Sequence, residues 1–448
     1  MVEFNGKTFN NFIYVGYDIL INENKIVLHY SVDNLYFFNP EYSLDLNSLN
    51  SIDKIEYEVF NFGMSEISSF YKAFCADNII IKCGFLNNEQ IKFWENLYTK
   101  GLGEFFYKNN IDFRNLIKIS TDSIKFKQRD ILDKVSSSID SDIHNKKVLL
   151  PIGGGKDSIV SAEILKEKNI DFSWFMIETI ENAIKVIDTS HVKSLYTISR
   201  NVETNFKLIK ELSQQGFPDG HVPISAVYAF SAVIIAKLHD FDYIAISQER
   251  SSNIGQTTYL GMEINHQYSK TFEMESNIHE YILKYISPNI YHFSILRHLY
   301  EIQIASEFVK HPEYFYSFIS CNKGLKTGIW CGICDKCVFT WSLLSAFLDI
   351  EILEKIWHKN LFEDKNLLTK FINLVGDGEM KAFDCVGTFE ESKLALYLAK
   401  ERLTKKNTDV SLPFILQNLD LEDGKNYLNY LHDYSNENLI PDKFLKKV

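Results

Sequence analysis

The feature that most constrains the fold of this chain is a run of three glycines between an apolar segment and a helical pattern. Residues 148–150 read Val-Leu-Leu, and residues 152–158 read Ile-Gly-Gly-Gly-Lys-Asp-Ser. Adjacent glycines permit a tight turn whose N–H groups face one point, and the N-terminus of the following helix favours an anion. This junction predicts an anion-binding loop between a strand and a helix.

The chemistry of the loop points to phosphate. A Walker loop needs Ser or Thr directly after Gly-Lys, and a dinucleotide fingerprint needs a third glycine where Ser158 stands, so neither fits. The run resembles the PP-loop of N-type ATP pyrophosphatases, which binds the β and γ phosphates of ATP, although Gly153 replaces the usual first Ser. The resemblance implies ATP with Mg²⁺ on six loop residues: Gly153, Gly154, Gly155, Lys156, Asp157 and Ser158.

Each polar loop residue has a predicted task. Lys156 adds positive charge toward phosphate oxygens, Asp157 can hold Mg²⁺, and Ser158 can cap the helix. The competing interpretation is a glycine-rich turn that binds nothing, because glycine, aspartate and serine also occur at turns for backbone reasons. Three glycines followed by Asp-Ser at such a junction favour the phosphate loop.

Strand and helix patterns continue after the loop. The sequence predicts strands at residues 172–177, 192–198 and 243–246, and helices at about 203–214 and 224–238. Strands that alternate with helices indicate a parallel sheet covered on both faces. The predicted fold class is therefore α/β, with a parallel-sheet PP-loop ATP pyrophosphatase domain.

The chain is predicted to divide into three parts. Residues 1–130 contain alternating, aromatic-rich runs such as 25–30, followed by helical patterns, which indicates an α+β N-terminal domain. Residues 131–345 form the ATP-binding domain with a four-cysteine metal site. Residues 346–448 form a mostly helical C-terminal region.

Composition limits the partners. The net charge of −12 over 448 residues disfavours nucleic acid. No basic segment followed by an apolar core opens the chain, and the longest apolar stretch, residues 225–238, is too short to span a bilayer. We therefore expect a cytoplasmic protein with a small-molecule substrate and no membrane contact; the sequence leaves the oligomeric state open.

Four of the seven cysteines are spaced like metal ligands. Cys331, Cys334 and Cys337 follow a C-x2-C-x2-C pattern, and Cys321 lies ten residues upstream. A closed four-thiolate site favours structural zinc, while a three-cysteine run also suits an iron–sulfur cluster. Buried free thiols are the third interpretation, disfavoured by three cysteines within seven residues.

Four further residues are candidates for substrate binding. Glu249, Arg250 and Asn253 follow the predicted strand 243–246, and ligands of open parallel sheets lie beyond the carboxyl ends of the strands. Arg297 lies among apolar residues and suits a buried carboxylate or phosphate clamp. The competing interpretations are solvated loop residues for the first three and a salt bridge to Glu301 for Arg297.

Two short segments supply candidate catalytic groups. Residues 263–270 read Glu-Ile-Asn-His-Gln-Tyr-Ser-Lys, with His266 and Lys270 close together in a segment of low apolar content. Such a segment is usually surface, but it can also present polar groups to a substrate. Cys385 is either catalytic or buried, and the sequence by itself favours buried.

These segments together resemble the MurL family, the UDP-N-acetylmuramoyl-L-alanyl-L-glutamate epimerases. The resemblance covers most of the chain, and its most particular parts are Asn-His-Gln-Tyr-Ser-Lys at 265–270 and Asp-Cys-Val-Gly at 384–387. It also includes Gly-Leu-Gly-Glu-Phe-Phe-Tyr at 101–107, the glycine-rich loop, Ser-Cys-Asn at 320–322 and the cysteine cluster.

The resemblance implies a reaction in peptidoglycan precursor synthesis. ATP adenylates the α-carboxylate of the terminal L-glutamate of a UDP-muramoyl dipeptide, and removal of the carboxylate charge makes the α-proton acidic. Proton removal on one face, return on the other and hydrolysis give the D-epimer, AMP and pyrophosphate. Two acid/base groups are needed, and His266, Lys270 and Cys385 are the candidates.

Two other functions are considered. One is a different PP-loop acid activator, such as a 7-cyano-7-deazaguanine synthase-like enzyme, in which ammonia attacks the adenylate and no α-proton exchanges. The other is a nucleotide-binding regulatory module that binds ATP without releasing pyrophosphate; the intact Gly-Lys-Asp-Ser run argues against it.

Overall fold

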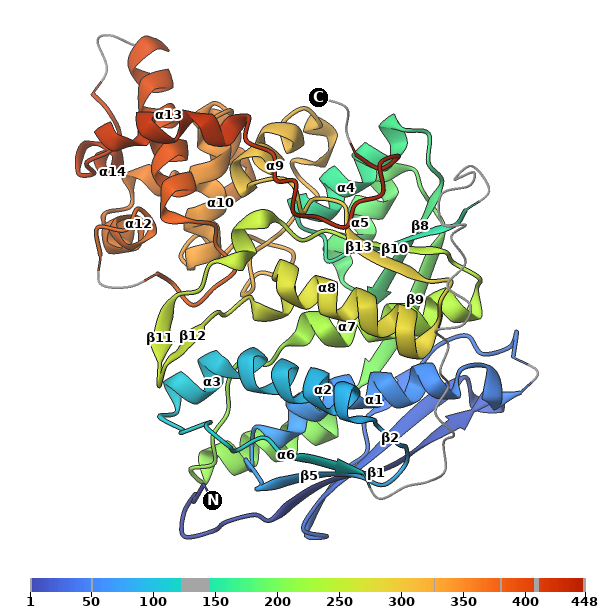
Figure 1. Ribbon diagram of the computed structural model, residues 1–448. Coiled ribbons are helices and arrows are strands. Elements are labelled where there is room, and N and C mark those ends of the chain that lie inside the picture. The colour runs from blue at the N-terminus through green and yellow to red at the C-terminus, as the bar shows by residue number, and fades with distance from the viewer. Residues whose placement is uncertain are drawn as a thin grey trace.

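The structure is a computed structural model that describes residues 2–49, 51–121, 146–325, 327–378, 381–406 and 411–445. It has a mixed α/β fold built around one eleven-stranded sheet (Figure 1). The strand order is β13-β10-β7-β8-β9-β4-β2-β1-β5-β6, with β3 paired to β2. A separate two-stranded hairpin consists of β11 (Thr257–Tyr259) and β12 (Met262–Ile264).

One half of the sheet is parallel. It comprises β7 (Val148–Pro151), β8 (Phe172–Ile177), β9 (Leu195–Asn201), β10 (Tyr243–Ile246) and β13 (Tyr291–Ser294). The strands predicted at 148–150, 172–177 and 243–246 are confirmed. The strand predicted at 192–198 begins three residues later, and β13 was not predicted, because its Tyr-His-Phe-Ser sequence lacks an apolar run.

Helices cover this parallel half. They are α4 (Lys156–Glu167), α5 (Glu181–Ser190) and α7 (Ile224–Leu238). Helix α6 (Glu203–Gln214) lies instead beside N-terminal elements, where its Phe206 ring packs against Phe70 of α1 (Glu56–Tyr71). The helices predicted at 203–214 and 224–238 are confirmed. Most residues of α7 are buried because it lies between the sheet, at β7 and β10, and helix α1. A helix that is apolar on nearly every side is stable only in such a position.

The N-terminal half of the sheet is mostly antiparallel, and three helices accompany it. Its strands are β1 (Asn11–Leu20), β2 (Lys25–Val32), β3 (Tyr36–Phe38), β4 (Glu41–Ser43), β5 (Asn78–Ile81) and β6 (Ile119–Thr121). The helices are α1 (Glu56–Tyr71), α2 (Asn88–Gly101) and α3 (Gly103–Lys108).

The two halves of the sheet join at an antiparallel pair of strands, β4 and β9. At this junction Arg200 of β9 forms a two-pronged ion pair with the buried Glu66 of α1, and the Tyr42 hydroxyl of β4 donates to the same carboxylate at 2.7 Å. The predicted domain boundary between residues 130 and 131 lies outside the described residues.

After the β11–β12 hairpin, the described elements are helices, with β13 as the one strand among them. Helices α12, α13 and α14 gather at the upper left of Figure 1, away from β1, β2 and β5. The later helices are α8 (Phe272–Tyr281), α9 (Glu301–Phe308), α10 (Asp335–Ser345), α11 (Ile350–Trp357), α12 (Leu368–Leu374), α13 (Phe389–Lys406) and α14 (Phe414–Gln417). Within the described ranges, no helix has the length and apolar character needed to cross a membrane.

Candidate active site

A cavity of about 500 Å³ lies at the carboxyl ends of β7, β8 and β10. Ligands of open parallel sheets bind at this end of the strands. Residues of the glycine-rich loop form one wall, and apolar side chains of β8 and α7 form another. Polar side chains complete the lining: His221, Gln248, His266, Gln267, Lys270, Asn322, Lys336 and Cys385 among them.

The glycine-rich loop connects β7 to α4, as predicted. Gly154 has a φ of +83°, in the left-handed region where side chains are strained. A Cβ on Gly155 would lie 2.8 Å from the Ser320 hydroxyl oxygen, so the loop can approach that segment only without a side chain. Gly155 is the N-cap of α4, and the helix N-terminus therefore meets the cavity where an anion is favoured.

Lys156 is not among the residues that line the cavity. It is 1% exposed and pairs with both Asp157 and Glu301, and although burial opposes its charge, these carboxylates raise its pKa. Lys156 as a phosphate ligand remains a prediction that would require this ion pair to open. The lysines that do line the cavity are Lys270 and Lys336.

Asp157 lines the cavity at the first turn of α4. Burial by itself would raise its pKa, but the charges of Lys156 and Lys336 outweigh burial and lower it. Its carboxylate is therefore charged near neutral pH, as a residue that holds Mg²⁺ must be.

Cys385 lies on the cavity wall beside two cationic side chains. The Lys270 Nζ is 3.3 Å from the Cys385 Sγ, and a ring nitrogen of His266 lies within 4.8 Å of the same sulfur. Burial would raise the pKa of the thiol, but Lys270, His266 and Lys336 lower it to about 6. At neutral pH the group is mainly a thiolate, which is the reactive form of cysteine.

His266 is held by a buried carboxylate on its other side. Its Nδ1 is hydrogen-bonded to Oε2 of Glu104, a residue of α3 that is 4% exposed. Burial alone would lower the pKa of His266, yet its interactions with Cys385 and Glu104 raise it to about 9. The neighbouring His221 ring, 4.2 Å away between centroids and tilted by 39°, stays neutral, because burial and the His266 charge lower its pKa to about 3.

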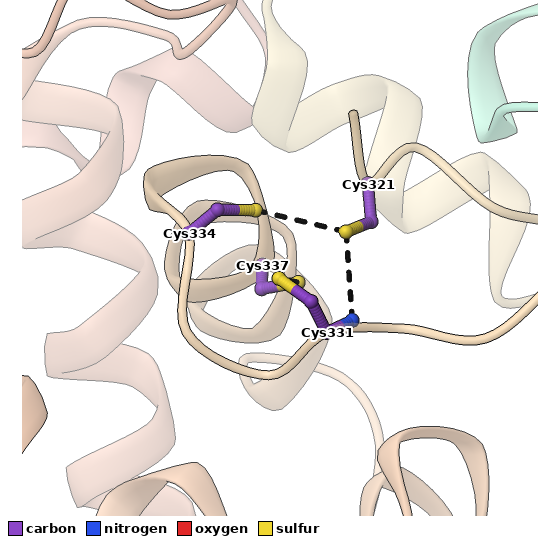
Figure 2. A group of neighbouring side chains, drawn as sticks. All are labelled: Cys321, Cys331, Cys334 and Cys337. Carbon is purple, nitrogen blue, oxygen red and sulfur yellow. Dashed lines mark hydrogen bonds between the residues drawn. The ribbon is translucent and has the colours of Figure 1, made fainter. Parts of the chain in front are cut away.

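The four predicted metal-ligating cysteines lie together. Figure 2 shows the side chains of Cys321, Cys331, Cys334 and Cys337 converging, with sulfur atoms within 4.8 Å of one another. The Cys321–Cys334 and Cys331–Cys337 sulfur pairs are each 3.7 Å apart. Four thiolates in this arrangement can hold a metal ion.

The cysteine cluster also shapes the cavity. Ser320 and Asn322 flank Cys321 and line the cavity, and Lys336 lies between Cys334 and Cys337 at the start of α10. The Lys336 ammonium donates to the backbone carbonyl of Cys385. A metal on the cluster would therefore stabilise the segments that carry these cavity residues.

Comparison with known proteins identifies the family of this chain. The family model of the MurL N-terminal domain matches residues 3–295, and that of the MurL C-terminal domain matches residues 317–421. The chain belongs to the MurL family. Its predicted membership and its character as an enzyme are thereby confirmed.

Relatives in this MurL family carry one name, UDP-N-acetyl-alpha-D-muramoyl-L-alanyl-L-glutamate epimerase. The relative in Xanthomonas oryzae pv. oryzae is 29% identical over 355 residues, which cover 78% of this chain and 75% of that protein. The relative in Salinispora tropica is 28% identical, with 75% of this chain and 71% of that protein covered. A third, in a Micromonospora strain, is 28% identical over 75% of this chain and 72% of that protein.

The predicted substrate-binding residues have partners outside the cavity lining. Arg250 pairs with Asp433 at 3.0 Å and stacks over the Tyr300 ring. Asn253 accepts a hydrogen bond from the backbone N–H of Phe272 at 2.7 Å, and Glu249 is 4% exposed. None of these side chains is among the residues that line the cavity, so their contact with substrate remains a prediction.

Arg297 is buried and its donors are occupied. Its guanidinium pairs with Glu275 at 2.7 Å and donates to the backbone carbonyls of Glu249 and Lys270 at 2.5 and 2.6 Å. The competing interpretation, a salt bridge to Glu301, is wrong, because Glu301 pairs with Lys156. In this MurL family member, Arg297 therefore holds the backbone at Lys270 in place through its hydrogen bond to the Lys270 carbonyl.

Several residues in and around the site were not predicted, among them Glu104, Glu301 and Lys336. Glu104 lies within the 101–107 segment that resembles the family, and Lys336 lies within the cysteine motif. Each of these two residues is therefore in a segment with a recognisable sequence pattern. Nothing in the local sequence relates Glu104 to His266, which is 162 residues away along the chain.

Proposed function

We propose that this protein epimerises the terminal L-glutamate of UDP-N-acetylmuramoyl-L-alanyl-L-glutamate to D-glutamate, with ATP cleaved to AMP and pyrophosphate, in peptidoglycan precursor synthesis. The observation that carries the proposal is that the glycine-rich loop and the Cys385–Lys270–His266 cluster line one cavity. Activation of an acid and transfer of its α-proton can then occur on one bound substrate. The names of the relatives supply the substrate.

The loop side of the cavity suits ATP and the adenylation step. Backbone N–H groups at the start of α4 meet an anion, and the Lys270 and Lys336 ammonium groups add positive charge. These features support a PP-loop enzyme. Asp157 would hold Mg²⁺, which neutralises charge on the phosphates when bound.

The wall of the cavity around Cys385 suits proton transfer. An ionised carboxylate opposes removal of the neighbouring α-proton, and conversion to an acyl-adenylate removes that charge. Lys270 and Lys336 lie where they could stabilise an enolate oxygen, as fixed charges do in a cavity of low polarity. His266, Lys270 and Cys385 are the acid/base candidates, and all three lie close together at the cavity wall. Proton transfer at the opposite face of the α-carbon would therefore require a small movement of the substrate or of a side chain.

The cysteine cluster suits structural zinc. Four sulfurs at a zinc–sulfur distance of about 2.3 Å lie about 3.8 Å apart in a regular tetrahedron, and the two measured pairs are 3.7 Å apart. With four cysteine ligands, a bound zinc ion would have no coordination position open to water or substrate, so its role would be to stabilise the fold. The proposal also includes the division of the chain into three parts, with domain boundaries at 130/131 and 345/346.

The test is a reaction in deuterated water with ATP and the UDP-muramoyl dipeptide. We expect AMP, pyrophosphate and a D-glutamate product with deuterium at Cα. The His266→Ala variant should lose most deuterium uptake while retaining pyrophosphate release, because adenylation precedes proton transfer; His432→Ala, at an exposed site, should behave like wild type. ATP consumption with full retention of the α-hydrogen would instead favour an amide-forming or nitrile-forming relative.

A further inference from the structure

Cys385, His266 and Glu104 form a connected series of side chains that ends in the cavity. Cys385 lines the cavity, a ring nitrogen of His266 lies within 4.8 Å of its sulfur, and Glu104 is hydrogen-bonded to Nδ1 of the same ring. A thiol beside an imidazole that a carboxylate orients is the arrangement of an activated nucleophile. The three residues come from separate parts of the chain, so this arrangement is a property of the fold.

We propose that Cys385 is a nucleophile, and that its sulfur takes the glutamyl group from the acyl-adenylate to form an enzyme-bound thioester on which epimerisation occurs. This inference rests on the proposed function and adds a covalent step to it. The adenylate then serves to load the enzyme, and the α-proton is exchanged at the thioester.

The acyl transfer balances without a further reactant. An electron pair of the Cys385 thiolate forms a bond to the acyl carbon, and the bond between that carbon and the bridging phosphate oxygen breaks. AMP leaves with the oxygen and the bonding electrons. The thioester, like the adenylate, has no carboxylate charge, so its α-proton stays acidic.

The charges around Cys385 favour a nucleophile over a proton donor. Lys270 at 3.3 Å and the neighbouring His266 both stabilise the thiolate, and they hold its pKa at about 6. A group that is mainly deprotonated at neutral pH returns a proton poorly, but as a thiolate it attacks a carbonyl well. A metal ion on Cys385, His266 and Asp384 is disfavoured, because the Lys270 ammonium already occupies the space beside the sulfur.

Thioester formation would also prepare the acid/base pair. The Cys385 charge contributes to the raised pKa of both His266 and Lys270. When the thiolate is consumed, both pKa values fall, and one group can pass a proton to the phosphate of departing AMP, whose second pKa is about 6. That group then removes the α-proton, while the other, still protonated, returns a proton to the opposite face.

Hydrolysis closes the cycle. Water adds to the acyl carbon, the carbon–sulfur bond breaks, and Cys385 leaves as the thiolate with the bonding electrons. Of the two water protons, one passes to the neutral member of the His266–Lys270 pair and one is released as the product carboxylic acid ionises. The enzyme returns to its starting charge state.

The backbone of Cys385 is held in place for such a role. Its N–H donates to the Asp384 carboxylate at 2.8 Å, and its carbonyl accepts from Lys336. Asn322 donates to the same Asp384 carboxylate at 3.1 Å. These contacts fix the sulfur relative to the cavity, and orientation of this kind is what a nucleophile needs.

The experiment is an acid quench of full-length enzyme during a single turnover with ATP and the UDP-muramoyl dipeptide, followed by intact mass measurement. Wild type should gain the mass of the dipeptide substrate minus water, and peptide mapping should place the gain on Cys385. Cys385→Ala should show no adduct and at least 100-fold less epimerisation, yet retain ATP–pyrophosphate exchange with substrate, which also shows that it is folded. Cys83→Ala, which removes a thiol outside the cavity lining, is the matched control and should form the adduct.

The outcomes separate this inference from the proposed function. Epimerisation by wild type without an adduct at any quench time, or substantial epimerisation by Cys385→Ala, would contradict thioester formation. Either result would leave the proposed epimerase activity unaffected. Absence of both AMP and α-deuterium with wild type overturns the proposed function itself. Hydroxylamine added to Cys385→Ala should trap the accumulated adenylate as a hydroxamate that keeps the L configuration; a D-hydroxamate would show that epimerisation occurs on the adenylate.

Discussion

Asp157 is the carboxylate of the glycine-rich loop that faces the cavity, with a quarter of its side chain exposed. We expect Asp157→Ala to reduce formation of AMP and pyrophosphate by about 100- to 1000-fold, the scale seen when one charge-stabilising contact at a reacting centre is removed. A coupled pyrophosphate assay measures the loss. Asp188→Ala, an exposed aspartate on α5, should leave the rate unchanged; an equal fall in both variants would count against a specific role.

The Cys385 thiol should react with iodoacetamide with a midpoint near pH 6, because Lys270 and His266 stabilise its thiolate against burial. Loss of the ammonium in Lys270→Gln removes a charge that favours the deprotonated form, so the midpoint should move to higher pH, toward the ordinary thiol value of about 8.5. Mass mapping of the alkylated peptide across a pH series measures it. Lys310→Gln, at a surface site, should leave the midpoint unaltered; an unmoved midpoint in Lys270→Gln would contradict the assignment.

At the scale of elements, the cysteine loop connects metal binding to the cavity through α10. We expect about one zinc per chain on elemental analysis, and Cys331→Ser should lose the metal, lower Tm by several degrees and weaken adenylation, since metal binding is coupled to folding at such sites. The reason for the effect on activity is that Lys336 lies in the first turn of α10, between the two predicted ligands Cys334 and Cys337. Cys83→Ser should retain zinc. Stoichiometric iron with a visible absorption band would assign the site to an iron–sulfur cluster.

The contact between α8 and the segment that follows β13 depends on one buried ion pair. Glu275 of α8 accepts from Arg297 and from the backbone N–H of Ser294, both at 2.7 Å. Glu275→Ala would leave the Arg297 charge buried without its partner, and we expect a loss of about 3 to 5 kcal/mol in the free energy of unfolding. Denaturant unfolding measures it. Glu313→Ala, at a carboxylate that is half exposed, is the control, and a similar small loss in both would show that the pair adds little.

At the scale of the whole molecule, the site exists only because distant parts of the chain meet. Glu104 comes from α3 beside the N-terminal sheet, His266 and Lys270 follow the β11–β12 hairpin, and Cys385 precedes α13 (Figure 1). The sheet is continuous across the β4–β9 pair, which fixes the N-terminal elements against the parallel half that carries the glycine-rich loop.

This convergence predicts that a substitution in the N-terminal part affects proton transfer and spares adenylation. Glu104→Gln should lower the pKa of His266 from about 9, because the carboxylate is one of the groups that raise it. Deuterium uptake should fall by about 100-fold, the lower end of acid–base contributions, while ATP–pyrophosphate exchange continues. Glu95→Gln on α2 is a control outside the cavity lining. Loss of exchange together with deuterium uptake would indicate a general structural defect.

The sequence by itself determined the features that depend on neighbouring residues. The glycine-rich turn between β7 and α4, the strands at 172–177 and 243–246 and the helices at 203–214 and 224–238 follow from local geometry and periodicity. The cysteine spacing predicted a four-thiolate cluster, because short C-x2-C turns place sulfurs on one side of a loop.

Only the tertiary structure decided which distant groups share a site. It turned Lys156 toward Glu301, used the donors of Arg297 for internal support, and added β13 to the sheet as a strand with no apolar run of its own. It brought Glu104, His266 and Cys385 together, and these contacts shift the pKa values of His266 and Cys385. The physical reason is that burial and charge act through space, over distances of a few ångströms that the order of residues along the chain does not specify.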